Sequence, residues 1–152
     1  MMKSLSLVVM LLSVITFRSC DDLNPHDDVT LGLDSVYSGG TLYLTPYVVY
    51  EGEEEATFQF GSSIAWIDKV EQEDEIIYQY EGEPVDVDQK TTLGHEDERG
   101  GFTIELTVEP GIYDVYLTAE YFMYIGEWPE ENMPPEYGHF KIQTIDIQGN
   151  GD

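Results

Sequence analysis

Two neighbouring stretches of this chain alternate strictly between apolar and polar residues. Residues 101–108 read GFTIELTV, with apolar side chains at every second position, and residues 112–122 read IYDVYLTAEYF and alternate again. A period of two places successive side chains on opposite faces of a strand, so each stretch predicts a strand with one buried face. The turn signal Glu109-Pro110-Gly111 between them predicts a β-hairpin.

The alternation also predicts which side chains reach the core. We expect these to be Phe102, Ile104, Leu106 and Val108 in the first stretch and Tyr113, Val115, Leu117 and Ala119 in the second. Further strands are expected at Val29–Val36, Thr41–Tyr50 (interrupted at Pro46), Ala56–Phe60, Ile64–Val70, Glu75–Tyr80 and Phe140–Ile147. No segment carries a sustained helical stripe of apolar residues. Short strands separated by turn signals predict an all-β sandwich or barrel.

Two local patterns carry more specific expectations. In the last strand the apolar phase changes between Ile142 and Ile145, and a β-bulge near Gln143-Thr144 would reconcile the two halves. The tetrapeptide Tyr-Glu-Gly-Glu occurs at 50–53 and at 80–83, and more loosely at 124–127. The unequal spacing excludes a solenoid repeat. We interpret it as a turn at strand ends, in which glycine supplies a positive φ.

Two segments resemble parts of immunoglobulin-like and polycystic-kidney-disease (PKD) type domains. YVVYEGEEEATFQF (47–60) resembles their first strands, and EPGIYDVYLTAEY (109–121) resembles the corner before their strand F. The resemblance implies an immunoglobulin-like antiparallel β-sandwich of about seven to nine strands. We assign it to residues 29–148 and treat 149–152 as a disordered tail.

The resemblance also implies roles for four residues. Tyr113 becomes the corner tyrosine, whose hydroxyl bonds to the backbone upstream, and Trp66 becomes the core tryptophan of strand C. Phe60 and Val115 stand where antibody domains have their two cysteines, so apolar contact would replace the inter-sheet disulfide. This chain has one cysteine in all, which excludes a disulfide within one copy.

That cysteine, Cys20, follows a positively charged start, a mostly apolar run over 5–17 and the small residue Ser19. The layout is that of a secretory signal, and the run is shorter than the roughly 20 residues a membrane-spanning helix needs. A cysteine directly after a small residue resembles the bacterial lipoprotein signal. The resemblance implies a signal peptide at 1–19, a lipid on Cys20 and an acidic tether at 20–28. The alternative is a plain secreted protein with a buried cysteine.

The acidic pair Asp21-Asp22 after Cys20 also resembles the surface-export signal of some Gram-negative lipoproteins. With the lipid, it implies a protein anchored in the outer membrane and exposed at the cell surface. All 31 acidic residues lie after Cys20, where four Lys and Arg residues oppose them, so the formal charge of that part is −27. Such a body is repelled by phosphate backbones, which excludes nucleic acid as a partner. Anionic lipid repels it too, so its hold on a membrane must be covalent.

Chemistry-bearing residues are few or scattered. The three histidines lie far apart in sequence, Ser62-Ser63 forms no nucleophile elbow, and no cofactor or catalytic residue is expected. Acidic loops could gather oxygen ligands for Ca²⁺, with Asp86, Asp88, Glu96 and Asp97 as candidates. The spacing fails as an EF-hand because Lys90 and Thr91 break it. Solvated loops are the alternative.

The stretch from 121 to 138 runs from a strand into a proline-rich loop with exposed aromatic candidates. Tyr124, Trp128 and Tyr137 offer flat apolar faces with polar edges, which suit sugar rings and protein hot spots. They could instead cap the core. From these features we expect a non-catalytic, lipid-anchored surface module that binds or adheres to a glycan or a protein. The alternative is a structural or assembly subunit of an outer-membrane complex, with calcium as a possible stabiliser.

Overall fold

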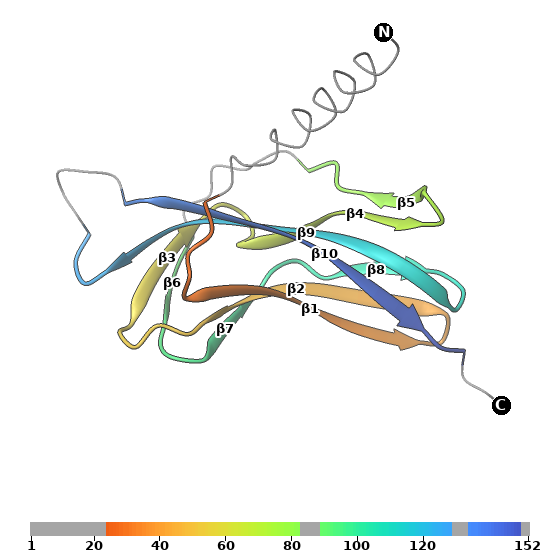
Figure 1. Ribbon diagram of the computed structural model, residues 1–152, viewed down its shortest axis with the longest axis horizontal. Helices are drawn as coiled ribbons and strands as arrows, with labels where there is room; N and C mark the ends of the chain where they lie inside the picture. The colour runs from red at the N-terminus through yellow and green to blue at the C-terminus, as the bar shows by residue number, and fades with distance from the viewer. Residues whose placement is uncertain (1–23, 83–88, 129–133, 150–152) are drawn as a thin grey trace, which may run out of the picture.

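The computed structural model describes residues 24–82, 89–128 and 134–149, and these form two antiparallel sheets packed face to face (Figure 1). An all-β antiparallel sandwich is thereby confirmed. The described residues contain ten strands, more than the seven to nine expected. They are β1 (Val29–Ser38), β2 (Thr41–Tyr50), β3 (Ala56–Phe60), β4 (Ala65–Gln72), β5 (Glu75–Gln79), β6 (Gln89–Leu93), β7 (Asp97–Gly100), β8 (Ile104–Thr107), β9 (Gly111–Ile125) and β10 (Glu136–Ile147). The proposed signal peptide, Cys20, Asp86, Asp88 and residues 150–152 lie outside the described residues.

The four-stranded sheet is built on the β1–β2 hairpin. Its register runs without a break from Val29↔Tyr50 to Ser38↔Thr41, and Gly39 and Gly40 close the turn with φ of 60° and 81°. Pro46 does not interrupt β2, because its missing N–H costs no hydrogen bond and its carbonyl accepts one from Gly101 (2.8 Å). The other edge of β2 pairs with β8 at one end and β7 at the other.

The six-stranded sheet is organised by β9, its longest strand. β10 pairs along one edge of β9, while β4 and β3 lie end to end along the other. β5 continues the sheet beyond β4, and β6 continues it beyond β3. Figure 1 shows β9 and β10 crossing the upper layer above β1 and β2.

The core lies between the two sheets and follows the period-two pattern. Tyr113, Val115, Leu117 and Ala119 of β9 are all buried, as their alternation predicted. The facing sheet contributes residues that include Leu42, Leu44 and Val48 of β2, and β3, a neighbour of β9 in its own sheet, adds Phe58. With no second cysteine available, this packing carries the stability of the sandwich.

The expected hairpin of residues 101–122 is wrong. β8 pairs with β2 in one sheet, whereas β9 lies in the other, so the Glu109-Pro110 turn crosses between sheets. Phe102 is also 49% exposed, because the strand begins only at Ile104. Alternation reports which side of a strand is buried, but not which strand it pairs with.

The expected bulge in the last strand is also wrong. β10 pairs with β9 in one unbroken register from Glu136↔Phe122 to Ile147↔Gly111. Ile145 and Ile147 point into the core, and Phe140 and Ile142 point to solvent, each 50% exposed. The change of phase therefore marks apolar side chains on the outer face of the sheet.

The immunoglobulin resemblance holds for the sandwich architecture and fails in two details. Phe60 and Val115 are both buried, but β3 and β9 are neighbours in the same sheet, so they cannot stand in for an inter-sheet bridge. Trp66 is not a core residue: it alternates with buried Ala65 and Ile67 and points outward from β4.

Tyrosines fix several of the turns. The buried Tyr113 donates its hydroxyl to the Glu109 carbonyl, and Tyr50 donates to the Glu54 carbonyl at 2.6 Å. A Cβ on Gly52 would lie 2.1 Å from the Tyr50 hydroxyl oxygen, and Gly82 stands in the same relation to Tyr80. Neither glycine has a positive φ, so our interpretation of the Tyr-Glu-Gly-Glu pattern was wrong there. The glycine is needed because the tyrosine ring lies over it.

Candidate binding face

The outward side chains of the six-stranded sheet form a surface rich in aromatic rings, which we call the outer aromatic face. It consists of Trp66, Tyr80, Tyr116, Phe122, Tyr124, Trp128 and Phe140. β9 supplies Tyr116, Phe122 and Tyr124 from its even-numbered positions, since the odd-numbered ones from Tyr113 to Met123 are buried. Two strand residues advance the chain by about 6.8 Å, so the rings of β9 are spaced along an extended track.

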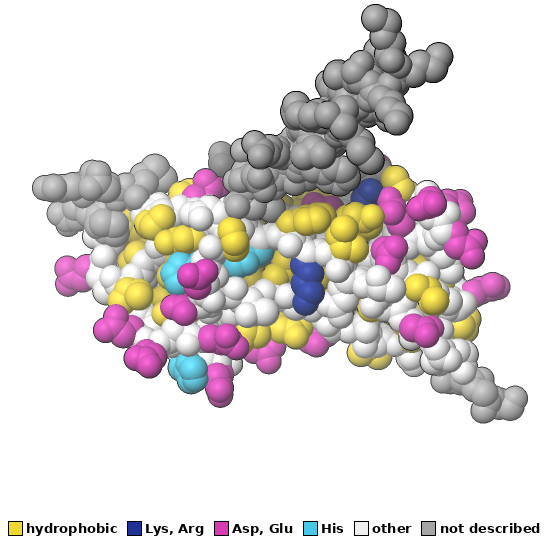
Figure 2. Space-filling model, in the orientation of Figure 1, with side chains coloured by type: hydrophobic (Ala, Val, Ile, Leu, Met, Phe, Trp, Pro, Cys, Tyr) yellow, Lys and Arg dark blue, Asp and Glu magenta, His cyan; other side chains and the backbone are white. Residues whose placement is uncertain are grey.

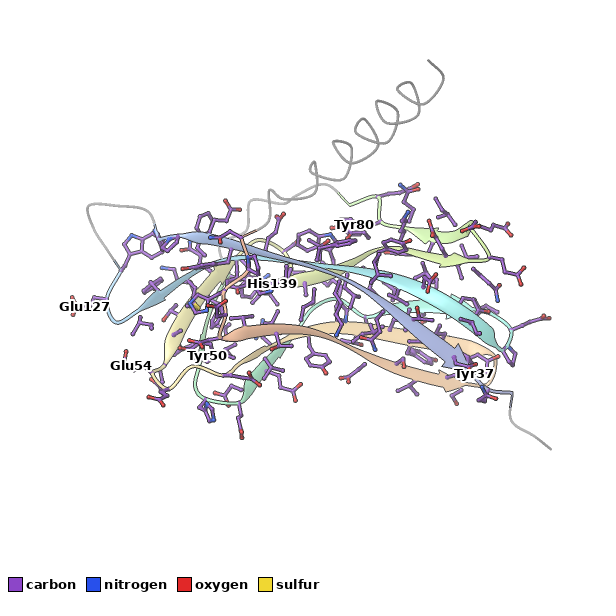
Figure 3. The ribbon with its side chains drawn as sticks, viewed as in Figure 1. Tyr37, Tyr50, Glu54, Tyr80, Glu127 and His139 are labelled. Carbon is purple, nitrogen blue, oxygen red and sulfur yellow. The ribbon has the colours of Figure 1, made fainter. Side chains whose placement is uncertain are left out.

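Trp66 and Asp68 lie at the centre of a hydrogen-bonded group on this face. The indole Nε1 of Trp66 donates to Asp68 Oδ1 at 2.9 Å, and the Thr118 hydroxyl donates to Asp68 Oδ2. The Tyr80 backbone N–H donates to the Asp68 carbonyl at 2.8 Å, which sets the Tyr80 ring against Trp66 in a stacked pair at 6.4 Å between centroids. Figure 3 shows Tyr80 above β4 on the outer side of the sheet. We call these four residues the Trp66 cluster.

A β-bulge in β4 explains why so many polar groups share this face. The register with β9 shifts between Ile67 and Lys69, so Asp68 is an extra residue. Before the bulge the outward position is Trp66, and after it the outward positions are Lys69 and Glu71. A bulge of this kind redirects side chains locally.

Lys69 and Glu71 form a second ordered group beside the first. Lys69 Nζ lies 2.7 Å from Glu71 Oε1, and the Tyr116 hydroxyl donates to Glu71 Oε2 at 3.0 Å. The hydrogen bonds from Lys69 and Tyr116 lower the pKa of Glu71, and the hydrogen bond to Glu71 raises the pKa of Lys69. Glu71 is therefore a carboxylate and Lys69 an ammonium at neutral pH.

The predicted binding loop is divided by the structure. The rings of Tyr124 and Trp128 meet edge to face at 5.1 Å, and Lys90 Nζ lies 5.1 Å from the Trp128 ring centre. Tyr137 is not with them: it stacks on Tyr121 at 5.8 Å and packs against the core. Trp128, at 37% exposed, and Tyr124 thus belong to the outer aromatic face, while Tyr137 closes one end of the sandwich.

A buried tyrosine–histidine pair lies at that end. The Tyr121 hydroxyl lies 2.7 Å from His139 Nε2, and both side chains are buried. Burial raises the pKa of Tyr121, so the phenol keeps its proton, and the tautomer of His139 decides which of the two groups donates the hydrogen bond. Burial, and then the nearby His26, lower the pKa of His139. Figure 3 places His139 between the two layers.

Mild acid should therefore destabilise the protein through His139. The unfolded chain takes up a proton near the ordinary histidine pKa of about 6.5, whereas the folded chain resists it until lower pH. The stabilisation that neutral His139 contributes is fully present above the ordinary histidine pKa of about 6.5. It is lost as the pH falls toward the lower pKa that His139 has in the folded protein. Urea unfolding should show a smaller loss of stability between about pH 8 and about pH 5 in His139→Gln than in the parent chain. The exposed His95→Gln serves as control, and equal pH dependence in all three proteins would contradict the assignment.

The calcium candidates are only partly described. Glu96 and Asp97 lie at the β6–β7 turn, where Asp97 Oδ2 accepts from the Gly94 N–H at 2.7 Å and Glu96 has a φ of 66°. Among the residues that the structure describes, no group of three or more His, Cys, Asp or Glu side chains is placed to hold a metal ion. At this turn the Asp97 carboxylate satisfies a backbone donor.

Neither protein-family models nor curated proteins match this chain. Within the described residues, no helix has the length and apolar character needed to cross a membrane. The candidate site therefore rests on geometry. It combines flat rings with fixed carboxylates, an arrangement that binds polyhydroxylated or amide-bearing ligands through stacking and hydrogen bonds.

Sequence reasoning missed Asp68, Thr118, Lys69, Glu71 and Tyr116 as members of a site. A signal was present in the spacing Trp66-x-Asp68, because two residues apart on a strand share a face. The bulge that adds Lys69 and Glu71 to that face has no comparable sequence mark.

Proposed function

We propose that this protein is a non-catalytic binding module, held at the bacterial cell surface by a lipid on Cys20, whose outer aromatic face binds a glycan. The observation that carries the proposal is the Trp66 cluster, in which an aromatic pair lies beside a carboxylate with two fixed donors. Aromatic rings stack on the C–H faces of sugars, and carboxylates accept from sugar hydroxyls.

The charge of the chain narrows the class of glycan. With 31 acidic residues against six Lys and Arg, the surface repels sulfated and uronic-acid-rich polymers. Neutral or amino sugars fit better. Tyr116, Phe122 and Tyr124 along β9 favour an extended oligosaccharide over a single ring, because β9 spaces them along one line.

Titration of neutral and amino oligosaccharides against the chain from residue 20 onward, carrying Cys20→Ser, tests this function. That chain keeps every described residue. Trp66→Ala should weaken binding by at least about tenfold, and Asp68→Asn should weaken it less, because the amide still accepts from Thr118. Trp128→Ala reports whether the ligand extends to that end of β9.

Tyr43→Ala is the matched control. Tyr43 is an exposed aromatic residue on β2, in the opposite sheet, and its loss should leave binding unchanged. Parent and Trp66→Ala proteins that bind equally well, or a glycan panel with no ligand at all, would overturn the proposed site.

A further inference from the structure

β10 has one free edge. In the part of the chain that the structure describes, β10 pairs with β9 along one side and with no strand along the other. The Gly138 N–H points away from β9, since it donates to the Asn24 carbonyl at 3.1 Å. Backbone groups alternate along an antiparallel strand, so Phe140, Ile142 and Thr144 also turn their N–H and C=O groups outward.

Exposed apolar side chains lie along this edge, in a chain rich in acidic residues. Phe140 and Ile142 are each 50% exposed, and the Phe140 ring lies 6.2 Å from that of Tyr116. An open groove of about 480 Å³ separates β10 from β1; its lining residues are Pro25, Val29, Thr30, Leu31, Gly138, His139, Phe140 and Lys141. None of these is acidic, in a chain with 31 acidic residues. Figure 2 shows acidic side chains mainly around the margin of this face and apolar ones along its middle.

A long edge strand with exposed apolar side chains is a template for another strand. One outward backbone group on this edge already has a partner, because the Gly138 N–H donates to the Asn24 carbonyl. Lys141 limits access from the groove side, where its Nζ lies 3.4 Å from the outward carbonyl of Leu31. Among the described residues, no strand pairs with the outward backbone groups of Phe140, Ile142 and Thr144.

We infer that β10 pairs with β10 of a second copy of this chain, antiparallel and with Ile142 opposite Ile142 of the second copy. In this register Phe140 faces Thr144, so all three outward-turned residues exchange backbone hydrogen bonds with outward-turned residues. Lys141 lies opposite Gln143 and His139 opposite Ile145, so no like charges meet. The two six-stranded sheets become one, and Phe140 and Ile142 are covered by their counterparts.

The self-complementary edge favours a second copy over an acidic or basic partner protein. Lys141 is the one residue of the groove lining with a formal charge. A single charge gives a strongly acidic or basic partner little to pair with. The acidic bodies of the two copies repel each other, and salt screens that repulsion within about 8 Å at physiological ionic strength. Association should therefore strengthen as salt is added, opposite to the behaviour of a complex between opposite charges. The inference does not depend on glycan binding.

Oxidative cross-linking tests the register in the full chain carrying Cys20→Ser, in a mild non-ionic detergent. Residues that form a hydrogen-bonded antiparallel pair have Cα atoms about 5.5 Å apart, which suits a disulfide. Ile142→Cys should therefore form a disulfide-linked dimer at least about tenfold faster than Val36→Cys, which is 59% exposed on β1.

Sedimentation equilibrium supplies the second measurement. The parent should form a dimer, and its dissociation constant should decrease as the NaCl concentration is raised from about 0.02 M to about 0.5 M. Phe140→Lys should raise that constant by at least about tenfold, because symmetry adds two charges to the interface. Circular dichroism should show that this exposed substitution leaves the strands intact.

Equal cross-linking of Ile142→Cys and Val36→Cys would overturn the inference. So would a parent that stays monomeric across the salt range, or that forms higher oligomers without a dimer. A self-association that weakens as salt is added would depend on attraction between opposite charges and would also overturn it.

Discussion

Gly101→Ala is expected to lower the free energy of unfolding by about 3 kcal/mol or more, measured by urea denaturation followed by circular dichroism. A Cβ at this position would lie 2.0 Å from the Ala65 carbonyl oxygen and 2.8 Å from Ser63 Oγ. Contacts this short do not occur between real atoms, so either β4 or the 101–103 segment must move.

Neither β4 nor the 101–103 segment can shift without breaking packing or hydrogen bonds. Ala65 is fully buried and pairs with Ala119 of β9, and the Gly101 N–H donates to the Pro46 carbonyl of β2. Gly101 therefore sits where the edge of one sheet touches the first residue of a strand in the other. The contact also explains why the alternating stretch of residues 101–108 forms a strand only from Ile104.

Gly100→Ala is the matched control for this substitution. A Cβ on Gly100 would meet the Thr45 methyl group at 3.8 Å, an ordinary van der Waals contact, and its φ is not positive. We expect its stability to stay within about 1 kcal/mol of the parent. If the two alanine variants unfold at the same urea concentration, the close packing at Gly101 is wrong.

Cys20→Ser is expected to move the protein from the membrane fraction to the soluble fraction almost completely. Each buried CH₂ of an acyl chain contributes about 0.8 kcal/mol, and stable anchoring requires more than one chain. The residues after Cys20 cannot compensate, because their formal charge of −27 is repelled by anionic lipid. Phase separation in detergent, followed by intact-mass measurement, should show a parent that begins at Cys20 and carries acyl groups.

Trp66→Ala is the control for anchoring, since it changes the proposed binding face and leaves Cys20 in place. It should remain in the membrane fraction. A parent protein that is released without detergent and has an unmodified sulfhydryl would exclude the lipid anchor, and the binding measurements would still stand on their own.

The strands that sequence predicted best are those with an inward apolar residue at every second position. β2 and β3 begin and end where their patterns do, at Thr41–Tyr50 and Ala56–Phe60. β6 and β7 were missed, because Gln89–Leu93 has one buried residue and Asp97–Gly100 has none. These two strands are specified by backbone pairing with β3 and β2, which leaves no mark in their composition.

Pairing partners and outward contacts were the parts that sequence could not supply. The turn at Glu109-Pro110 looks the same whether it joins strands of one sheet or of two. In the candidate site, Trp66 was expected in the core because the immunoglobulin resemblance makes it the tryptophan of strand C. Its outward direction depends on Ala65 and Ile67 occupying the inner face of β4. Thr118 joins Asp68 only through the pairing of β4 with β9.

The central place of β9 has a consequence for the order of folding. β3 ends at Phe60 and β4 at Gln72, long before β9 begins at Gly111. The two strands lie along β9 end to end, so neither completes its hydrogen bonding until β9 is present. Pairings between such distant segments close slowly, because the intervening chain must first lose its freedom. β3 and β4 would therefore stay only partly paired until nearly the whole polypeptide is available. Such a delay would suit a chain that must be threaded through a translocation channel before it folds.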